Sequence, residues 1–445
     1  METLQVAPPE YQHDTIRRIT WRLIPFMMLL YFIAFLNRVN VGFAAKIGSM
    51  NTDLGISETL YGFCGGIFFV GYFLLEVPSN LLLHRFGARR WIARIMITWG
   101  IISAGTAFVI GAKTYVSARF LLGMAEAGFF PGMILYLTYW FPAAIRARMT
   151  ALFVAAIPIS GIIGAPLSGY LLDMNGIGGL KGWQWMFLIE GIPAIILGAI
   201  VPFYLTDRPA QARWLKPAQI EWIESTLEGE SRQKAHMPLL RALVHPSILA
   251  LSAIYFCMMI GLYNMNLWMP SVLEGAGIAK RDVKWIAAIP PICGALLMFF
   301  WGRHSDRTRE REGHVAFALL TAAAGCVLAA LPTYRVFGDH FTPLTNQIFC
   351  TSGFCLLAIG IYCAMPTFWP LPSARLSGTA AAGGIAVVNS VGNLGGFAGP
   401  YAIGYIKDHW FGYTGGLLAT AVVVALGAVL VMASKPKAVL QPPVP

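Results

Sequence analysis

Residues 183–205 read WQWMFLIEGIPAIILGAIVPFYL, an apolar run that contains one charged residue, Glu190. A helix needs roughly 20 mostly apolar residues to cross the hydrocarbon core of a membrane. Eleven further runs of similar character follow one another along the 445 residues, and they are continuous rather than alternating, which favours spanning helices over a membrane β-barrel. The twelve predicted helices are 21–45, 58–82, 91–111, 114–141, 149–173, 183–205, 246–273, 282–302, 315–335, 344–371, 379–406 and 413–434.

The composition of the whole chain is that of a membrane protein. Charged residues make up 12% and hydrophobic residues 57%, and the mean hydropathy is +0.64. In a soluble domain about a quarter of the residues would be charged. The first 20 residues are polar and the first apolar run is long enough to span, so no cleavable signal peptide is expected.

The net charge of +11 could suggest nucleic-acid binding, but the positions of the charges argue against it. If the loops alternate between the two sides of a membrane, most of the 32 Lys and Arg residues fall on one side. Cytoplasmic loops carry such an excess. The sequence therefore predicts a multi-pass protein of the bacterial inner membrane, in contact with lipid, with both termini in the cytoplasm.

Metal, cofactor and enzyme functions are not expected. The seven cysteines lie within apolar runs, and none of the eight histidines lies deep in a predicted helix. The sequence contains no His pair, activated Ser or Cys motif, or Gly-rich phosphate loop of the kind that enzymes use.

A polar stretch at 206–245 divides the chain into residues 1–205 and 246–445, with six predicted helices in each part. The two parts resemble each other: NLLLHRFGARR at 80–90 follows the second helix, and GRHSDR at 302–307 follows the eighth. The fifth and eleventh helices both carry several glycines and a proline. We therefore predict an all-α membrane protein of two pseudo-symmetric six-helix bundles joined by a cytoplasmic linker, with a substrate site between them.

These stretches resemble known transporter motifs. Residues 80–90 are similar to the loop motif Gly-x-Leu-x-Asp-Arg-x-Gly-Arg-Arg of the major facilitator superfamily, with Asn80 and His84 in place of its Gly and Asp. Residues 37–44 (NRVNVGFA) and 182–193 (GWQWMFLIEGIP) resemble the anion:cation symporter family. That resemblance implies a permease for tartrate, phthalate, 4-hydroxyphenylacetate or a sugar acid.

Arg38 and Arg119 fall inside apolar runs at similar predicted depth. A charge at that depth is costly, so it is a functional candidate. Facing one cavity, the two guanidinium groups would form a two-pronged carboxylate site, and the resemblance assigns the substrate carboxylate to these positions. The alternative is a snorkelling arginine or a structural ion pair.

Glu126 follows Arg119 by seven residues, so both are expected on one face of the fourth helix. A buried carboxylate beside an arginine can change protonation when an anion enters, and the resemblance implies that Glu126 couples the proton; a permanent Arg–Glu pair is the alternative. Many members of the resembled family have a second protonation site before the first-helix arginine. Asn37 stands there in this chain and cannot titrate, which predicts one proton per anion or loss of tight coupling.

Further polar and aromatic residues are candidates for the same site. Tyr31 and Phe35 share a helix face with Arg38, Tyr263 and Asn264 precede a predicted helix break before Pro270, and Asn389 and Asn393 are one turn apart. Gating or structural roles are expected for Arg85, Arg89, Asp306, Arg307, Glu76 and Glu190, with ion pairs of the 85–90 and 306–307 loops holding an outward-facing state.

Together these residues predict a monomeric, proton-coupled symporter that imports a small organic carboxylate anion by alternating access. Two alternatives stay open within transport, namely an organic-anion exchanger and a uniporter without proton coupling. A transporter-like membrane sensor is a third alternative, although no predicted cytoplasmic segment exceeds about 40 residues, which is small for a folded signalling domain. The sequence does not identify the carboxylate.

Overall fold

The computed structural model describes residues 9–232, 246–308, 310–333, 342–375 and 387–434. This part of the chain is helical and contains no strand. Eleven stretches of it are long and apolar enough to cross a membrane. The predicted helix 379–406 begins among residues outside the described part. Of this helix, the structure describes a helical segment at 387–393 and the helix that follows it. The predicted fold class is confirmed.

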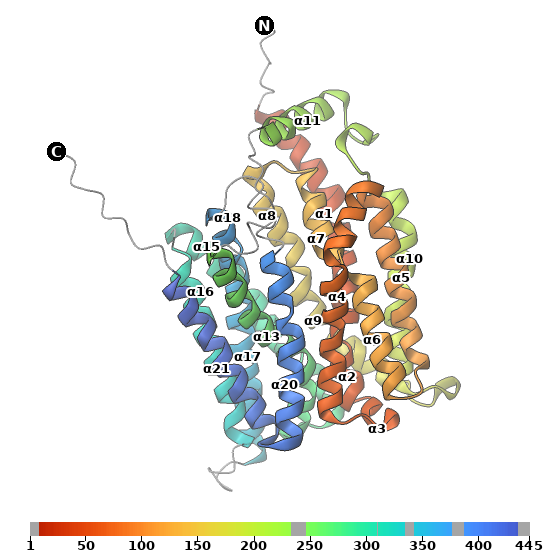
Figure 1. The fold of residues 1–445 in the computed structure, drawn as a ribbon, viewed down its shortest axis with the longest axis vertical. Helices are drawn as coiled ribbons and strands as arrows, with labels where there is room; N and C mark the ends of the chain where they lie inside the picture. Colours follow the sequence, from red (N-terminus) through yellow and green to blue (C-terminus); the bar gives the residue numbers. More distant parts are fainter. Residues whose placement is uncertain (1–8, 233–245, 309, 334–341, 376–386, 435–445) are drawn as a thin grey trace, which may run out of the picture.

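Helices of the first half of the chain lie together, on the right in Figure 1, and those of the second half lie on the left. The first half contains α1 (Pro9–Val39), α2 (Val41–Lys46), α3 (Met50–Leu54), α4 (Glu58–Phe86), α5 (Ala88–Gly105), α6 (Ala112–Glu126), α7 (Phe129–Thr138), α8 (Ala143–Val154), α9 (Ala156–Leu172) and α10 (Gly182–Tyr204). The second half contains α13 (Pro246–Gly275), α14 (Lys280–Ile286), α15 (Ile289–Thr308), α16 (Glu312–Ala330), α17 (Pro343–Phe368), α18 (Pro370–Arg375), α20 (Gly395–His409) and α21 (Gly412–Ala433).

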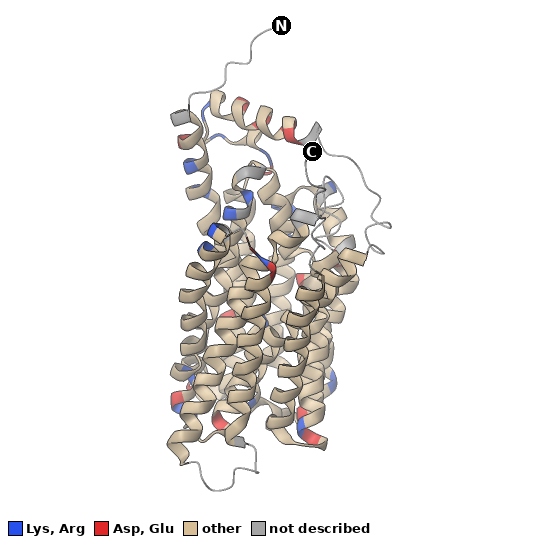
Figure 2. Ribbon diagram, turned by 90° about the vertical axis from the view of Figure 1, so that its left-hand side faces the viewer, with Lys and Arg blue, Asp and Glu red and all other residues tan. Residues whose placement is uncertain are grey.

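Between the halves, α11 (Pro217–Arg232) lies across the end of the molecule at which α1 begins (Figure 1). Basic residues gather at this end, and the middle of the molecule is largely uncharged (Figure 2). We call the opposite end, which carries α3, the outer end, because the distribution of basic residues predicts that it faces away from the cytoplasm. The division into two bundles at 206–245 and the orientation of the termini stay predictions.

Several of the predicted spanning helices are interrupted. Helix 21–45 is divided into α1 and α2, 114–141 into α6 and α7, 149–173 into α8 and α9, and 282–302 into α14 and α15. At the second interruption Gly128 has φ +86°, a left-handed conformation that glycine adopts without a steric penalty. The hydroxyl of Ser79 donates a 2.6 Å hydrogen bond to the carbonyl of Ala127, which satisfies a polar group exposed by the break.

The predicted break before Pro270 is wrong, because α13 runs continuously through that residue. Proline removes the hydrogen bond to the carbonyl four residues earlier, which here belongs to Asn266. Helix α2 lies against this carbonyl so closely that a Cβ on Gly42 would be 2.8 Å from its oxygen. Packing by the neighbouring helix therefore covers the interruption that the proline creates.

Candidate functional site

Arg38 lies in the last turn of α1, directly before the first interruption. Its Nη1 donates a 2.9 Å hydrogen bond to the hydroxyl of Tyr263 on α13, and its Nη2 contacts the carboxylate of Glu126 on α6. Arg38 is 6% exposed and Glu126 is 1% exposed. One buried guanidinium thus connects the two halves of the chain.

Glu126 is the last residue of α6, so it also stands directly before an interruption. Its Oε1 contacts Arg38, while its Oε2 is buried without a hydrogen-bond partner. The Nε of Arg38 is likewise buried and unpaired. Unpaired buried polar atoms are uncommon and costly. The site therefore has one donor and one acceptor free for a further polar group.

Aromatic rings surround the guanidinium of Arg38. Its central carbon lies 5.3 Å from the ring centroid of Phe68, 5.5 Å from that of Tyr72 and 5.9 Å from that of Phe35. Cations within about 6 Å of a ring face are attracted to it. The rings therefore keep water away from the guanidinium while stabilising its charge.

A narrow cavity adjoins this cluster and takes its lining from both halves of the chain. Six of the residues predicted for the substrate site lie on it, together with aromatic residues that the sequence analysis did not single out, Tyr72, Tyr255 and Trp369. The six predicted residues are Tyr31, Phe35, Arg38, Tyr263, Asn389 and Asn393.

Two predicted binding residues lie elsewhere. Arg119 is 1% exposed, and its Nε donates a 3.2 Å hydrogen bond to the carbonyl of Cys64 on α4 rather than lining the cavity. Asn264 donates 2.8 Å to the hydroxyl of Thr420 on α21, which turns it toward the interior of the second half. Among the described residues that line the cavity, Arg38 alone supplies a guanidinium.

Glu76 connects the halves at a second point. Its carboxylate accepts hydrogen bonds of 3.0 Å from Asn389 and 2.6 Å from Ser390, across the interface between α4 and the helical segment at 387–393. Glu76 is buried, and Asn389 also lines the cavity. A change at the cavity can therefore reach this contact between the halves directly.

The model of the Major Facilitator Superfamily matches residues 27–400, with a second match over 251–445. The chain belongs to the major facilitator superfamily. It is therefore a membrane transporter rather than an enzyme, and the resemblance seen in the loop motifs is confirmed at this level.

Curated relatives of this superfamily member cover nearly its whole length. A protein of Agrobacterium vitis, provisionally named a tartrate transporter, is 49% identical over 98% of the chain and 95% of its own length. A protein of Acinetobacter baumannii named a quinolone resistance transporter is 37% identical over 95% of both chains. Among solved structures, the xylose transporter of Escherichia coli has a TM-score of 0.75 with 14% identity, covering 94% of this chain and 98% of the other.

The outer end of this superfamily member is closed by contacts that the sequence analysis missed. Glu58 at the start of α4 forms an ion pair with Lys407 of α20, and Lys284 of α14 lies 2.5 Å from Asp173 after α9. Among the described residues these are the ion pairs that join the two halves. The signal in the sequence was a charged residue at the outer end of each of four predicted helices.

At the opposite end, no contact joins the described side chains of Arg85 and Arg89 to that of Arg307. Arg85 is exposed, and Arg89 contacts Asp207, with its backbone N–H 2.8 Å from the carboxylate. Arg307 is exposed, and the side chain of Asp306 lies outside the described residues. Ion pairs of these loops in an outward-facing state stay a prediction. In the described part of the chain, no three metal-ligating side chains gather.

Proposed function

We propose that this transporter imports a small organic carboxylate anion together with a proton across the bacterial inner membrane. The observation that carries the proposal is the buried guanidinium of Arg38, held by Glu126 of the first half and Tyr263 of the second at the wall of a shared cavity. Guanidinium binds carboxylates in two-point geometry. The relatives provisionally named tartrate transporters support an organic acid as substrate.

The proposed coupling is a competition for Arg38. An incoming carboxylate takes the place of Glu126 at the guanidinium, and a buried carboxylate that loses its cation is expensive to keep charged. Glu126 then takes up a proton, so that the anion and the proton occupy the site together. When the anion leaves toward the cytoplasm, Glu126 returns to Arg38 and releases its proton on that side as well.

The cavity lining offers polar groups that suit tartrate. One of its carboxylates would bind Arg38, and its hydroxyl groups would bond to the amides of Asn389 and Asn393 on the other wall. In this arrangement the substrate would contact both halves, which is how a ligand can favour one arrangement of the halves over another. Arg119 would join the site only if α6 moves relative to α4 in another state.

A second candidate function has its own support. The relative named for quinolone resistance, together with the aromatic lining formed by Tyr31, Tyr72, Tyr255 and Trp369, favours a planar aromatic acid carried out of the cell. Quinolones as a class carry a carboxyl group, so Arg38 would have the same role. Exchange of one organic anion for another, without a proton, is the remaining alternative that the uptake experiment would reveal.

Uptake into proteoliposomes with an imposed inward proton gradient tests the proposal. Tartrate, hydroxyphenylacetate, galactonate and a quinolone would be compared in wild type, Glu126→Gln and Glu221→Gln. We expect one anion to accumulate in the wild type and in Glu221→Gln, whose changed residue is exposed on α11. Glu126→Gln should lose accumulation and keep exchange of labelled for unlabelled anion. If the gradient has no effect on the wild type, symport is wrong and the exchanger takes its place.

A further inference from the structure

Glu190 on α10 is buried, and the proposed mechanism gives its carboxyl group no role. It is 2% exposed. Its Oε1 accepts a 2.7 Å hydrogen bond from Ser168 of α9, and its Oε2 accepts 2.8 Å from the Nδ2 of Asn40. Its main-chain carbonyl accepts 2.9 Å from Asn37, whose own Oδ1 accepts from Ser103 of α5.

All of these donors are neutral. Helices α1, α2, α5 and α9 pack around this part of α10, and α9 carries no charged residue. The charged groups that α1 and α2 carry toward the outer end have other contacts: Arg38 binds Glu126 and Tyr263, and Lys46 lies 4.0 Å from Glu58. The charged residues of α5 are Arg89, Arg90 and Arg94, which lie in its first two turns, at the end of the molecule opposite the outer end. Over the described residues, Glu190 therefore has no cation partner, and a charge on it would be costly.

Asn40 can serve either protonation state of Glu190. Its Nδ2 donates to Oε2, while its Oδ1 is buried and has no partner. The oxygen and nitrogen of an amide exchange places by a half-turn about the last side-chain bond. With the amide turned, Oδ1 would accept the O–H of a protonated Oε2; with the amide as it stands, Nδ2 serves the carboxylate.

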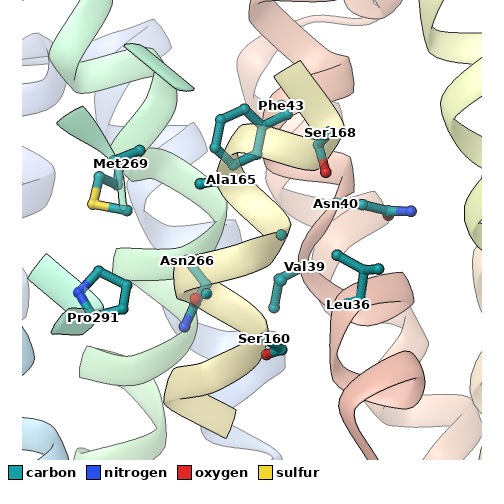
Figure 3. Close-up of a pocket in the computed structure, with 13 residues that line it drawn as sticks. Leu36, Val39, Asn40, Phe43, Ser160, Ala165, Ser168, Asn266, Met269 and Pro291 are labelled. Carbon is teal, nitrogen blue, oxygen red and sulfur yellow. The ribbon is translucent and has the colours of Figure 1, made fainter. Parts of the chain in front are cut away.

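A pocket leads from this network to the boundary between the halves (Figure 3). Asn40 and Ser168 line it from the first half, and Asn266 and Met269 line it from α13. Asn40 itself stands at the interruption between α1 and α2. At the outer end the pocket is covered because α2 packs on α13, with Gly42 against the carbonyl of Asn266. A movement of α2 away from α13 would remove this cover and admit water to the pocket from that side.

We propose that Glu190 is a proton-binding site filled from the outer side, and that it must carry a proton for α2 to close on α13. In the open state water would solvate the carboxylate, whereas in the closed state the described groups that bond to it are neutral donors. Closure therefore takes up one proton from the outer solution onto Oε2, with the amide of Asn40 turning to accept its hydrogen bond. Reopening returns this proton to the outer solution. Glu190 therefore adds no proton to the number transported across the membrane with each anion.

Infrared spectroscopy of the full-length purified protein tests the protonation itself, without any substrate. A protonated carboxyl has a carbonyl stretch that a carboxylate lacks. We expect wild type near neutral pH to show such a band that Glu190→Gln removes, that Glu126→Gln leaves in place, and that Glu190→Asp retains. If the band is the same in wild type and in a Glu190→Gln protein that elutes as a folded species, Glu190 is charged in the closed state and the proposal is wrong.

Exchange measurements test the consequence for closure and rest on the proposed transport activity. In a Glu126→Gln background, tartrate-for-tartrate exchange should still slow as the outer pH rises, by up to about ten-fold per pH unit once Glu190 titrates. Adding Glu190→Gln should remove that dependence, while adding Glu221→Gln should not. A dependence that survives Glu190→Gln would overturn the closure step. Absence of any exchange would count against the proposed function, and the infrared result would still decide whether Glu190 binds a proton.

Discussion

At the scale of single residues, the partner of Glu126 is not the arginine that its spacing suggests. Seven residues place Arg119 and Glu126 on one face of a helix, but two turns separate them along the axis. Glu126 instead contacts Arg38 of α1, and Arg119 bonds to the backbone of α4. The carboxylate-binding and proton-binding groups of the proposed mechanism therefore come from different helices, so that relative motion of these helices can change their contact.

Tyr263 should position the guanidinium of Arg38. Tyr263→Phe removes one hydrogen bond to a charged group, worth about 1.5–3 kcal/mol. We expect KM for the transported anion to rise roughly ten-fold with little loss of folded protein, measured by uptake into proteoliposomes. Tyr362→Phe is the matched control, because the Tyr362 hydroxyl is buried without a partner. An unchanged KM in Tyr263→Phe would show that Arg38 needs no support from the second half.

At the scale of elements, three polar residues in or beside the cavity stand at interruptions of spanning helices. Arg38 precedes the break between α1 and α2, Glu126 precedes that between α6 and α7, and Asn393 precedes the turn at Leu394. Broken helices within a membrane are tolerated where they line a cavity, since other groups there can satisfy the freed backbone. The interruptions also allow short segments such as α2 to move against the longer helices.

Gly42 permits α2 to close on α13. A Cβ at this position would lie 2.8 Å from the carbonyl oxygen of Asn266 and 3.0 Å from that of Leu267, and backbone atoms cannot move aside cheaply. Overpacking of this kind costs about 1–3 kcal/mol. Gly42→Leu should therefore hold the outer end open and stop transport.

The measurement is labelling of a Met269→Cys reporter, which lines the pocket between the halves, by a membrane-impermeant maleimide added from outside. The labelling rate should rise roughly ten-fold in Gly42→Leu. Gly105→Leu serves as control, because Gly105 is exposed and a Cβ there meets no atom within 4 Å. Equal labelling in the two variants would contradict the assignment of α2 as the closing segment.

At the scale of the whole molecule, the ion pairs that join the halves lie at the outer end, which defines the state of the structure as closed on that side. Alternating access requires these contacts to break and re-form in each cycle. Contacts that are too strong would trap one state. The Glu58–Lys407 and Asp173–Lys284 pairs reach the surface, where water weakens them, and so they suit a reversible closure.

Removing one of these pairs should favour the open outer end modestly. A pair near the surface contributes about 0.2–1 kcal/mol, so Glu58→Gln should raise labelling of the Met269→Cys reporter up to about five-fold. The double variant Glu58→Gln with Lys407→Gln should add little to the single change, since both remove the same contact. Asp282→Asn, at an exposed pair within α14, should change nothing. Strictly additive effects of Glu58→Gln and Lys407→Gln would show that the two residues act independently.

Sequence alone determined the class of this protein. Continuous apolar runs can satisfy their backbone hydrogen bonds in a membrane only as helices, so composition and run length predicted the fold. For example, α10 begins and ends one residue before the predicted helix 183–205. The repeated loop motifs led to the superfamily that the family match confirmed. The same helical periodicity placed Tyr31, Phe35 and Arg38 on one face, and the structure puts all three on the cavity.

Tertiary structure alone decided which charges meet. Apolar periodicity says which face of a helix is buried but not against which helix, and so it could not pair Arg38 with Glu126 or Glu76 with Asn389 across the halves. It also could not foresee that α13 continues through Pro270, because the group that covers the freed carbonyl belongs to α2, more than 200 residues earlier in the chain. A buried charge without a partner of opposite charge is costly. The packing of distant helices provides such a partner for Glu126, whereas the described residues that bond to Glu190 are neutral.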